Sequence, residues 1–99
     1  PLPLAIQWTD RCLEEFFLQG DEEKRRGLPV SPLCDRMTTH RAESQLGFIK
    51  FVVQPAFEVL GKIVPEVKDQ ILPILDANLH YWKEQKQEDD ISEFLEIHE

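Results

Sequence analysis

The fold of this chain is decided by the segment Ser44-Gln45-Leu46-Gly47-Phe48-Ile49-Lys50-Phe51. From Ala42 to Leu60, apolar residues occupy nearly every helical face, and a helix with so little polar surface lies inside a protein. Its large apolar residues are Leu46, Phe48, Ile49, Phe51, Val52, Val53, Phe57 and Leu60. The segment therefore predicts a buried core helix.

One face of this helix carries Gln45 in line with Phe48, Ile49 and Val52, at the spacing i, i+3, i+4, i+7. A buried side-chain amide without a partner costs about 1 to 3 kcal/mol. Gln45 is therefore either satisfied by its own protein or kept for a ligand.

The remaining elements are predicted from helix signals and breakers on both sides of the core helix, which spans residues 39–62. Before it come a helix at 4–19, a short helix at 21–26 and a loop at 28–37; after it come a helix at 65–86 and an acidic tail at 87–99. The tail is expected to be a short helix or a frayed end because its apolar residues are few.

Glycine and proline set most of these boundaries. Gly20 is placed to end the first helix in a left-handed cap, and Gly27 to end the second. Pro55 is expected to kink the core helix, since apolar periodicity continues beyond it. Gly47 costs helix stability, so we expect it to mark the close approach of another backbone. A bend is expected at Pro73.

Length and composition limit the class of protein. The 99 residues form at most one small domain, yet two Trp, six Phe and one Tyr are too much apolar surface for three helices to cover. We therefore expect an all-α piece of a larger globular body. The net charge of −8 argues against a nucleic-acid partner, which needs clustered Lys and Arg.

Little catalytic chemistry can be read from the residues themselves. Cys12 and Cys34 are too few for a disulfide framework, which predicts free thiols in a reducing compartment. Gln45 and Lys50 interrupt the longest apolar run, so we expect a soluble, intracellular protein with no membrane span in this segment. His40, His80 and His98 are scattered without metal-ligand spacing, and no nucleophile with a base and an orienting group is evident. The chain alone is expected to hold no metal centre.

Three motifs, in order along the chain, carry a resemblance to a known family. They are Glu14-Glu15-Phe16-Phe17-Leu18-Gln19-Gly20-Asp21, Gly27-Leu28-Pro29-Val30-Ser31-Pro32-Leu33-Cys34-Asp35-Arg36 and Ser44-Gln45-Leu46-Gly47-Phe48-Ile49. They resemble the C-terminal part of the class I cyclic nucleotide phosphodiesterase catalytic domain, over about residues 8–82.

The resemblance implies a fold, an activity and a location for this piece. The family is all-helical and hydrolyses cAMP or cGMP at a zinc and magnesium (or manganese) pair. The ligands of those metals lie in preceding segments that are absent from this sequence. The chain is thus expected to be a C-terminal helical subdomain of a cytoplasmic signalling enzyme, inactive alone. Its expected partners are the cyclic nucleotide and the preceding part of the same domain.

The resemblance also implies a purine-binding site. Gln45 matches the glutamine that hydrogen-bonds the base, and Phe48 matches the aromatic residue that stacks on it. Cys12 falls where the family usually has an aliphatic residue on the other side of the base. Its spacing alone, on a stripe with Trp8 and Phe16, favours an ordinary core thiol. Further lining positions match Phe16, Leu33 and Ser44.

A different class of function stays open from the residues alone. The stripes of the first helix and the core helix could serve a non-enzymatic helical module that binds a protein partner. Coding sequence upstream with paired His and Asp motifs would favour the enzyme over this module.

Overall fold

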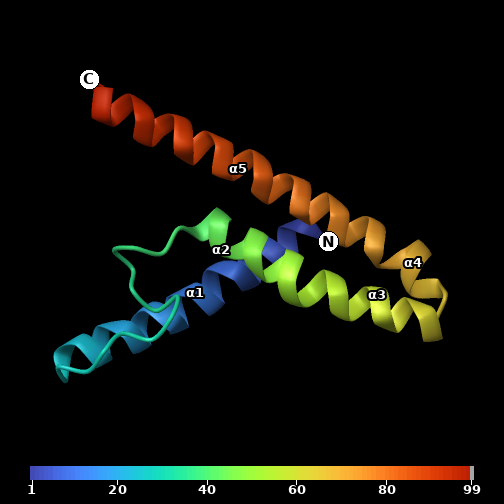
Figure 1. Cartoon of the computed structure of the whole chain (residues 1–99), viewed down its shortest axis with the longest axis horizontal. Coiled ribbons are helices and arrows are strands. Elements are labelled where there is room, and N and C mark those ends of the chain that lie inside the picture. The colour runs from blue at the N-terminus through green and yellow to red at the C-terminus, as the bar shows by residue number, and fades with distance from the viewer. Residues whose placement is uncertain (99) are drawn as a thin grey trace.

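The computed structural model describes residues 1–98, and all its regular elements are helices (Figure 1). They are α1 (Leu2–Arg25), α2 (Arg41–Phe48), the π-helix η1 (Ile49–Val53), α3 (Gln54–Ile63), α4 (Glu66–Gln70) and α5 (Leu72–His98). The prediction of an all-α fold is confirmed.

The helices form a flat body of 47 × 37 × 21 Å. In Figure 1, α2, η1 and α3 follow one another through the middle of the body, and α5 runs along one side of them. The start of α1 lies against α5, and the rest of α1 extends away from it. A long loop returns from the end of α1 to the start of α2. A body this flat exposes much of its apolar surface, as expected of a piece that packs against more protein.

The core lies where α2 and η1 pack against α5. Ala42, Leu46 and Ile49 meet Leu79 and Trp82, and Trp82 is 1% exposed. Arg41 fixes the start of α2 against two other helices. Its guanidinium group donates to Asp10 of α1 at 2.7 Å and lies 4.9 Å from the centre of the Trp82 ring. Such a planar cation suits both contacts.

Pro55 disturbs the core helix one turn before its own position. It has no N–H to donate, and its ring crowds the carbonyl four residues earlier, that of Phe51. The chain takes up this strain as the wider π-helix η1, and Pro55 then lies in the first turn of α3. The helical pitch thus changes just before Pro55, where the sequence predicts a kink.

Two glycines have roles opposite to those predicted. Gly20 does not end a helix: α1 runs through it to Arg25, so the predicted helices 4–19 and 21–26 are one. Gly20 is buried because the Cys34 carbonyl lies where a Cβ atom would stand. Gly47 meets nothing within 4 Å of an added Cβ, so the predicted close approach at Gly47 is wrong. Gly27, at φ +69°, does terminate the helix.

The predicted helix at 65–86 is two helices, since α4 ends at Gln70 and α5 begins at Leu72, a break close to the bend expected at Pro73. Pro73 causes this break, because a proline without an N–H is accommodated best in the first turn of a new helix. From there α5 continues through the predicted acidic tail to His98, supported by residues of good helix propensity and by the Lys86–Asp90 pair at 2.9 Å. Glu99 lies outside the described residues.

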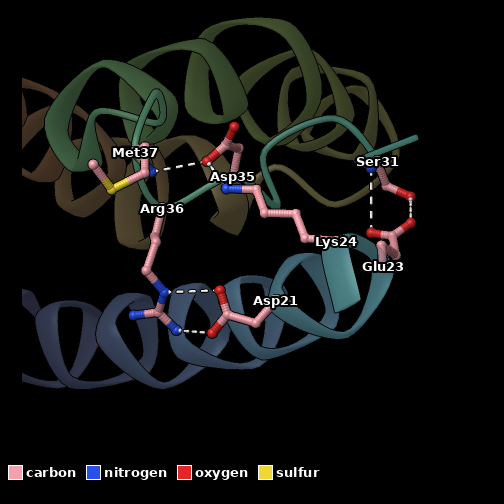
Figure 2. Close-up of polar contacts among 7 residues, drawn as sticks. All are labelled: Asp21, Glu23, Lys24, Ser31, Asp35, Arg36 and Met37. Atoms are coloured by element: carbon pink, nitrogen blue, oxygen red, sulfur yellow. Dashed lines mark hydrogen bonds and ion pairs between the residues drawn. The ribbon is translucent and has the colours of Figure 1, made fainter. Parts of the chain in front are cut away.

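The loop after α1 is fastened to that helix by three acidic side chains (Figure 2). Arg36 binds Asp21 through two hydrogen bonds of 3.1 and 2.7 Å. Ser31 donates its hydroxyl and its backbone N–H to Glu23, at 2.6 and 3.2 Å. Lys24 reaches Asp35 at 2.8 Å, and Asp35 also accepts from the Met37 N–H. We call these contacts the loop clamp.

The loop clamp should weaken in acid. Hydrogen bonds from Arg36, Ser31 and Lys24 lower the pKa values of Asp21, Glu23 and Asp35 respectively. A carboxylate with a lowered folded pKa stabilises the fold above its unfolded pKa, and this contribution is lost as pH falls through the folded value. The loss therefore belongs below about pH 4, the usual range of these groups.

We expect the backbone NMR signals of residues 28–37 to shift together as the pH falls from about 5 to about 2. In an Arg36→Gln variant, which lacks the Asp21 contact, the change should be smaller. Loop signals that stay constant down to the lower pH would show that the clamp does not hold the loop.

Candidate functional site

A cavity of about 380 Å³ lies between α1, α2, η1, α5 and the loop. Most of its lining is apolar, with few polar groups, as is typical of small-molecule sites. Its walls are formed by Ala5, Trp8, Thr9, Cys12, Leu13, Phe16, Leu33, Ser44, Gln45, Phe48, Ile49, Val53, Leu75, Asn78 and Trp82.

All six residues proposed from the sequence lie in this one cavity wall. They come from three separate parts of the chain: Cys12 and Phe16 from α1, Leu33 from the loop, and Ser44, Gln45 and Phe48 from α2. Helical spacing alone could not bring α1 and the loop to α2. The fold does so by packing α1 beside α2 and by fastening the loop to α1.

Within residues 1–98, the side-chain amide of Gln45 has a hydrogen-bond partner for its oxygen but not for its nitrogen. The Thr9 hydroxyl donates to Gln45 Oε1 at 3.2 Å, and Thr9 itself is 6% exposed. Among the described residues, no hydrogen bond occupies the amide nitrogen of Gln45. The oxygen is therefore held from within, and the Nε2 group is left to donate elsewhere.

The core-helix residues that line the cavity match the predicted helical face at all positions but one. Gln45, Phe48 and Ile49 line the cavity as the helical spacing predicts, but Val53 lines it in place of Val52. The π-helix explains the shift, because its wider turn delays the return of the chain to the same face. Val52 instead borders a neighbouring depression on the other side of Phe48.

The loop brings Leu33 to the cavity in an uncommon conformation. Leu33 has φ +66°, in the left-handed region that few non-glycine residues occupy. The turn around it is closed by the Cys34 N–H donating to the Ser31 carbonyl at 3.1 Å. Cys34, 4% exposed, then packs against Gly20, and burial raises the pKa of its thiol. The absence of a side chain at Gly20 thus lets the loop reach the cavity.

Sequence reasoning missed two polar residues of the wall, Thr9 and Asn78. Thr9 is the partner of Gln45, and Asn78 lies on α5 between the apolar residues Leu75 and Trp82 of the same wall. The Oδ1 atom of Asn78 is buried and lacks a hydrogen-bond partner among residues 1–98. A polar residue in the middle of an apolar helical stripe was the signal available for Asn78.

The described residues supply no metal site. Nowhere in residues 1–98 do three or more His, Cys, Asp or Glu side chains come together in a group that could hold a metal ion. The zinc and magnesium pair implied by the resemblance therefore does not fit the residues present. What the cavity can do chemically is bind and orient a flat, largely apolar ligand with a polar edge.

Comparison with known sequences decides the family. The sequence profile described as 3'5'-cyclic nucleotide phosphodiesterase matches residues 1–74. The chain belongs to this phosphodiesterase family.

Individual phosphodiesterases agree with the profile. The chain is 44% identical over 97 residues to the high affinity cGMP-specific 3',5'-cyclic phosphodiesterase 9A of Mus musculus, covering 97% of this chain and 18% of that protein. It is 41% identical over 83 residues to the 3',5'-cyclic-AMP phosphodiesterase 4C of Mus musculus, covering 84% and 12%. The solved structure of LmjPDEB1 in complex with IBMX superposes with a TM-score of 0.79 and 30% identity, over 88% of this chain and 26% of that one.

The chain spans less than a fifth of the length of these two curated phosphodiesterases. The structural neighbour likewise extends well beyond the matched part. Among the described residues, no helix has the length and apolar character that crossing a bilayer requires.

Proposed function

We propose that this chain forms the purine-recognising part of a 3',5'-cyclic nucleotide phosphodiesterase that hydrolyses cAMP, cGMP or both to the 5'-monophosphate. The observation that carries the proposal is the gathering of Cys12, Phe16, Leu33, Ser44, Gln45 and Phe48 around one cavity. A purine offers two flat apolar faces and a polar edge, so it needs an apolar cavity that contains an amide.

Gln45 would bind the base edge through its amide. With Oε1 held by Thr9, the Nε2 group is free to donate to an acceptor on the base. A hydroxyl both donates and accepts, so Thr9 keeps a hydrogen bond if the amide rotates by half a turn. Gln45 can then present a donor or an acceptor, which suits adenine and guanine alike. The relatives, whose names include a cGMP-specific and a cyclic-AMP enzyme, are consistent with either base.

Phe48 would stack on the base, and Asn78 would supply a second polar contact. The Phe48 side chain stays half exposed although it borders the cavity, so its ring is available to a ligand. The buried Oδ1 atom of Asn78 accepts no hydrogen bond from the described residues, and an N–H group of the base would satisfy it. The aromatic face and the polar atoms together suit a purine.

Bond cleavage is proposed to depend on the preceding part of the same catalytic domain. We place the zinc and magnesium (or manganese) ligands there, because the described residues of this chain offer no such group. That preceding part is then also the main protein partner of this piece, in a cytoplasmic enzyme. The chain contributes binding and orientation of the nucleotide.

The test is hydrolysis of both nucleotides by the full-length protein and by a Gln45→Ala variant. Loss of the amide should lower kcat/KM, because each hydrogen bond contributes about 0.5 to 1.5 kcal/mol and unpaired base atoms add to the loss. The matched control is Gln54→Ala, which removes an equal amide whose partner is Glu58 one turn along the exposed face of α3. Gln54→Ala should leave kcat/KM unchanged.

Two results would contradict the proposal. If Gln45→Ala folds and retains the full kcat/KM for both nucleotides, Gln45 is not in the base site. If the full-length protein neither binds nor hydrolyses cyclic nucleotides, the non-enzymatic interaction module becomes the better explanation of the exposed apolar faces.

A further inference from the structure

The end of α5 extends beyond the packed body of the protein (Figure 1). Trp82 is its last buried residue, and every described residue after Lys86 is exposed. The family profile ends at residue 74, whereas the similarity to phosphodiesterase 9A of Mus musculus extends over 97% of the chain. An isolated helical segment of this length is only marginally stable in water. Its helix would be stabilised if its exposed side chains packed against a partner.

Three large apolar side chains form a continuous stripe on this free segment. Ile91, Phe94 and Leu95 are 60%, 58% and 54% exposed, and their spacing i, i+3, i+4 places them on one face. His98 extends the stripe, since its ring stacks on Phe94 with the ring centres 4.0 Å apart. We call this surface the α5 stripe. A contiguous apolar stripe that stays exposed on a helix is typical of an interaction surface.

The protein body does not cover the α5 stripe. The side of the segment that faces His40 and Glu43, at the start of α2, is its polar side. That side lines a depression with Lys86, Asp89, Asp90, Ser92, Glu93 and Glu96. At 3.6 residues per turn, Glu93 lies nearly opposite the centre of the stripe. The apolar face therefore points away from α2.

Charge decides which occupant fits the stripe. Residues 84–98 carry six carboxylates, Glu84, Glu88, Asp89, Asp90, Glu93 and Glu96, against one lysine, Lys86. A second copy of this segment, an anionic bilayer or a nucleic acid would each bring like charges to these carboxylates. A helix with an apolar face flanked by Lys or Arg would complement both the stripe and its rim.

We propose that the α5 stripe docks a cationic amphipathic helix of a partner protein. Ile91, Phe94 and Leu95 supply the apolar contact, and the flanking carboxylates select the positive partner and set its orientation. This binding is separate from nucleotide recognition, because none of these residues lines the purine cavity.

The probe is a synthetic 18-residue helical peptide with Leu at i, i+3, i+4 and i+7 and Lys at the remaining positions. Its binding to the full-length protein is measured by fluorescence anisotropy at two salt concentrations. A peptide with Glu in place of every Lys tests the charge, and one with Gln in place of every Leu tests the apolar face. We expect the first peptide to bind, more weakly in high salt, and the two control peptides not to bind.

The protein variant is Phe94→Gln with Leu95→Gln, and its matched control is Phe51→Gln. Phe51 is also exposed, at 81%, but lies on η1 away from the stripe. The double variant should weaken binding by about tenfold or more, while Phe51→Gln should not change it. Circular dichroism checks that both variants retain their helix content.

Three results would overturn the proposal. If the double variant binds the Leu/Lys peptide as tightly as the wild-type protein does, the peptide is held by charge alone and not by the α5 stripe. Failure of the Leu/Lys peptide to bind the full-length protein would mean that the stripe is covered by the rest of that protein. Self-association that the double variant abolishes would make a second copy the occupant.

Discussion

Gly20→Ala is expected to destabilise the protein, although alanine normally stabilises a helix. Replacing glycine by alanine in a helix interior is worth about 1 kcal/mol in favour of alanine. At Gly20, however, the added Cβ atom would overlap the backbone carbonyl of Cys34. A backbone group cannot rotate away as a flexible side chain does, so the loop or the helix must move. Overpacking of this kind typically costs about 1 to 3 kcal/mol, and more where backbone is displaced.

Gly47→Ala is the matched control. Gly47 also lies in a helix, α2, but an added Cβ atom there meets nothing within 4 Å. The same substitution should therefore stabilise the protein by up to about 1 kcal/mol. Thermal unfolding of the two variants of the full-length protein should show melting temperatures that change in opposite directions.

The effect of Gly20→Ala should also reach the cavity that Gln45 and Phe48 line. Cys34 directly follows Leu33, which lines the cavity in a left-handed conformation. A shift of the Cys34 carbonyl would displace Leu33, so the KM for cyclic nucleotide should rise in the folded fraction of the variant. A Gly20→Ala protein as stable as the wild type would show that the loop does not pack on α1 as described.

These two glycines show why part of the fold was accessible from sequence and part was not. Apolar periodicity predicts helices from neighbouring residues, and it located the central helix and the all-α class. The prediction that this helix is buried holds for Leu46 and Ile49 but not for Phe51 and Val52, which are exposed among the described residues. Whether a glycine ends a helix or admits another segment depends on what crosses it in space. The sequence therefore predicts a helix end at Gly20 and a crossing at Gly47, whereas in the structure the crossing is at Gly20.

The candidate site divides along the same line. Gln45, Phe48 and Ile49 share a helical face that can be predicted from their spacing. Cys12, Phe16 and Leu33 are predicted as site residues through the family resemblance. Val53 replaced Val52 because the strain from Pro55 changed the helical pitch, which a constant 3.6-residue period cannot anticipate. Asn78 was missed because its role depends on which groups remain without partners after folding.

Cys12→Trp is expected to abolish most of the nucleotide affinity while leaving the protein folded. The sequence left Cys12 as either a core thiol or a wall of the base site, and the structure finds it exposed and lining the cavity. An indole at this position would occupy the space between α1 and α2 that a purine needs. The variant would then lose base stacking, worth about 1 to 3 kcal/mol, and the hydrogen bonds of Gln45, worth about 0.5 to 1.5 kcal/mol each, which amounts to roughly a 100-fold rise in KM.

The matched variant is Cys12→Ile, which enlarges the same wall by less. If room remains beside the base, each added methylene buried against it contributes about 0.8 kcal/mol, so the KM should stay unchanged or fall. The melting temperature of the Cys12→Trp variant shows whether Cys12 lies in the cavity wall or in the packed core. An indole forced into a packed core costs about 1 to 3 kcal/mol or more, whereas one placed in an open cavity costs little. A Cys12→Trp protein with a lowered melting temperature, whose folded fraction binds nucleotide normally, would therefore remove Cys12 from the base site.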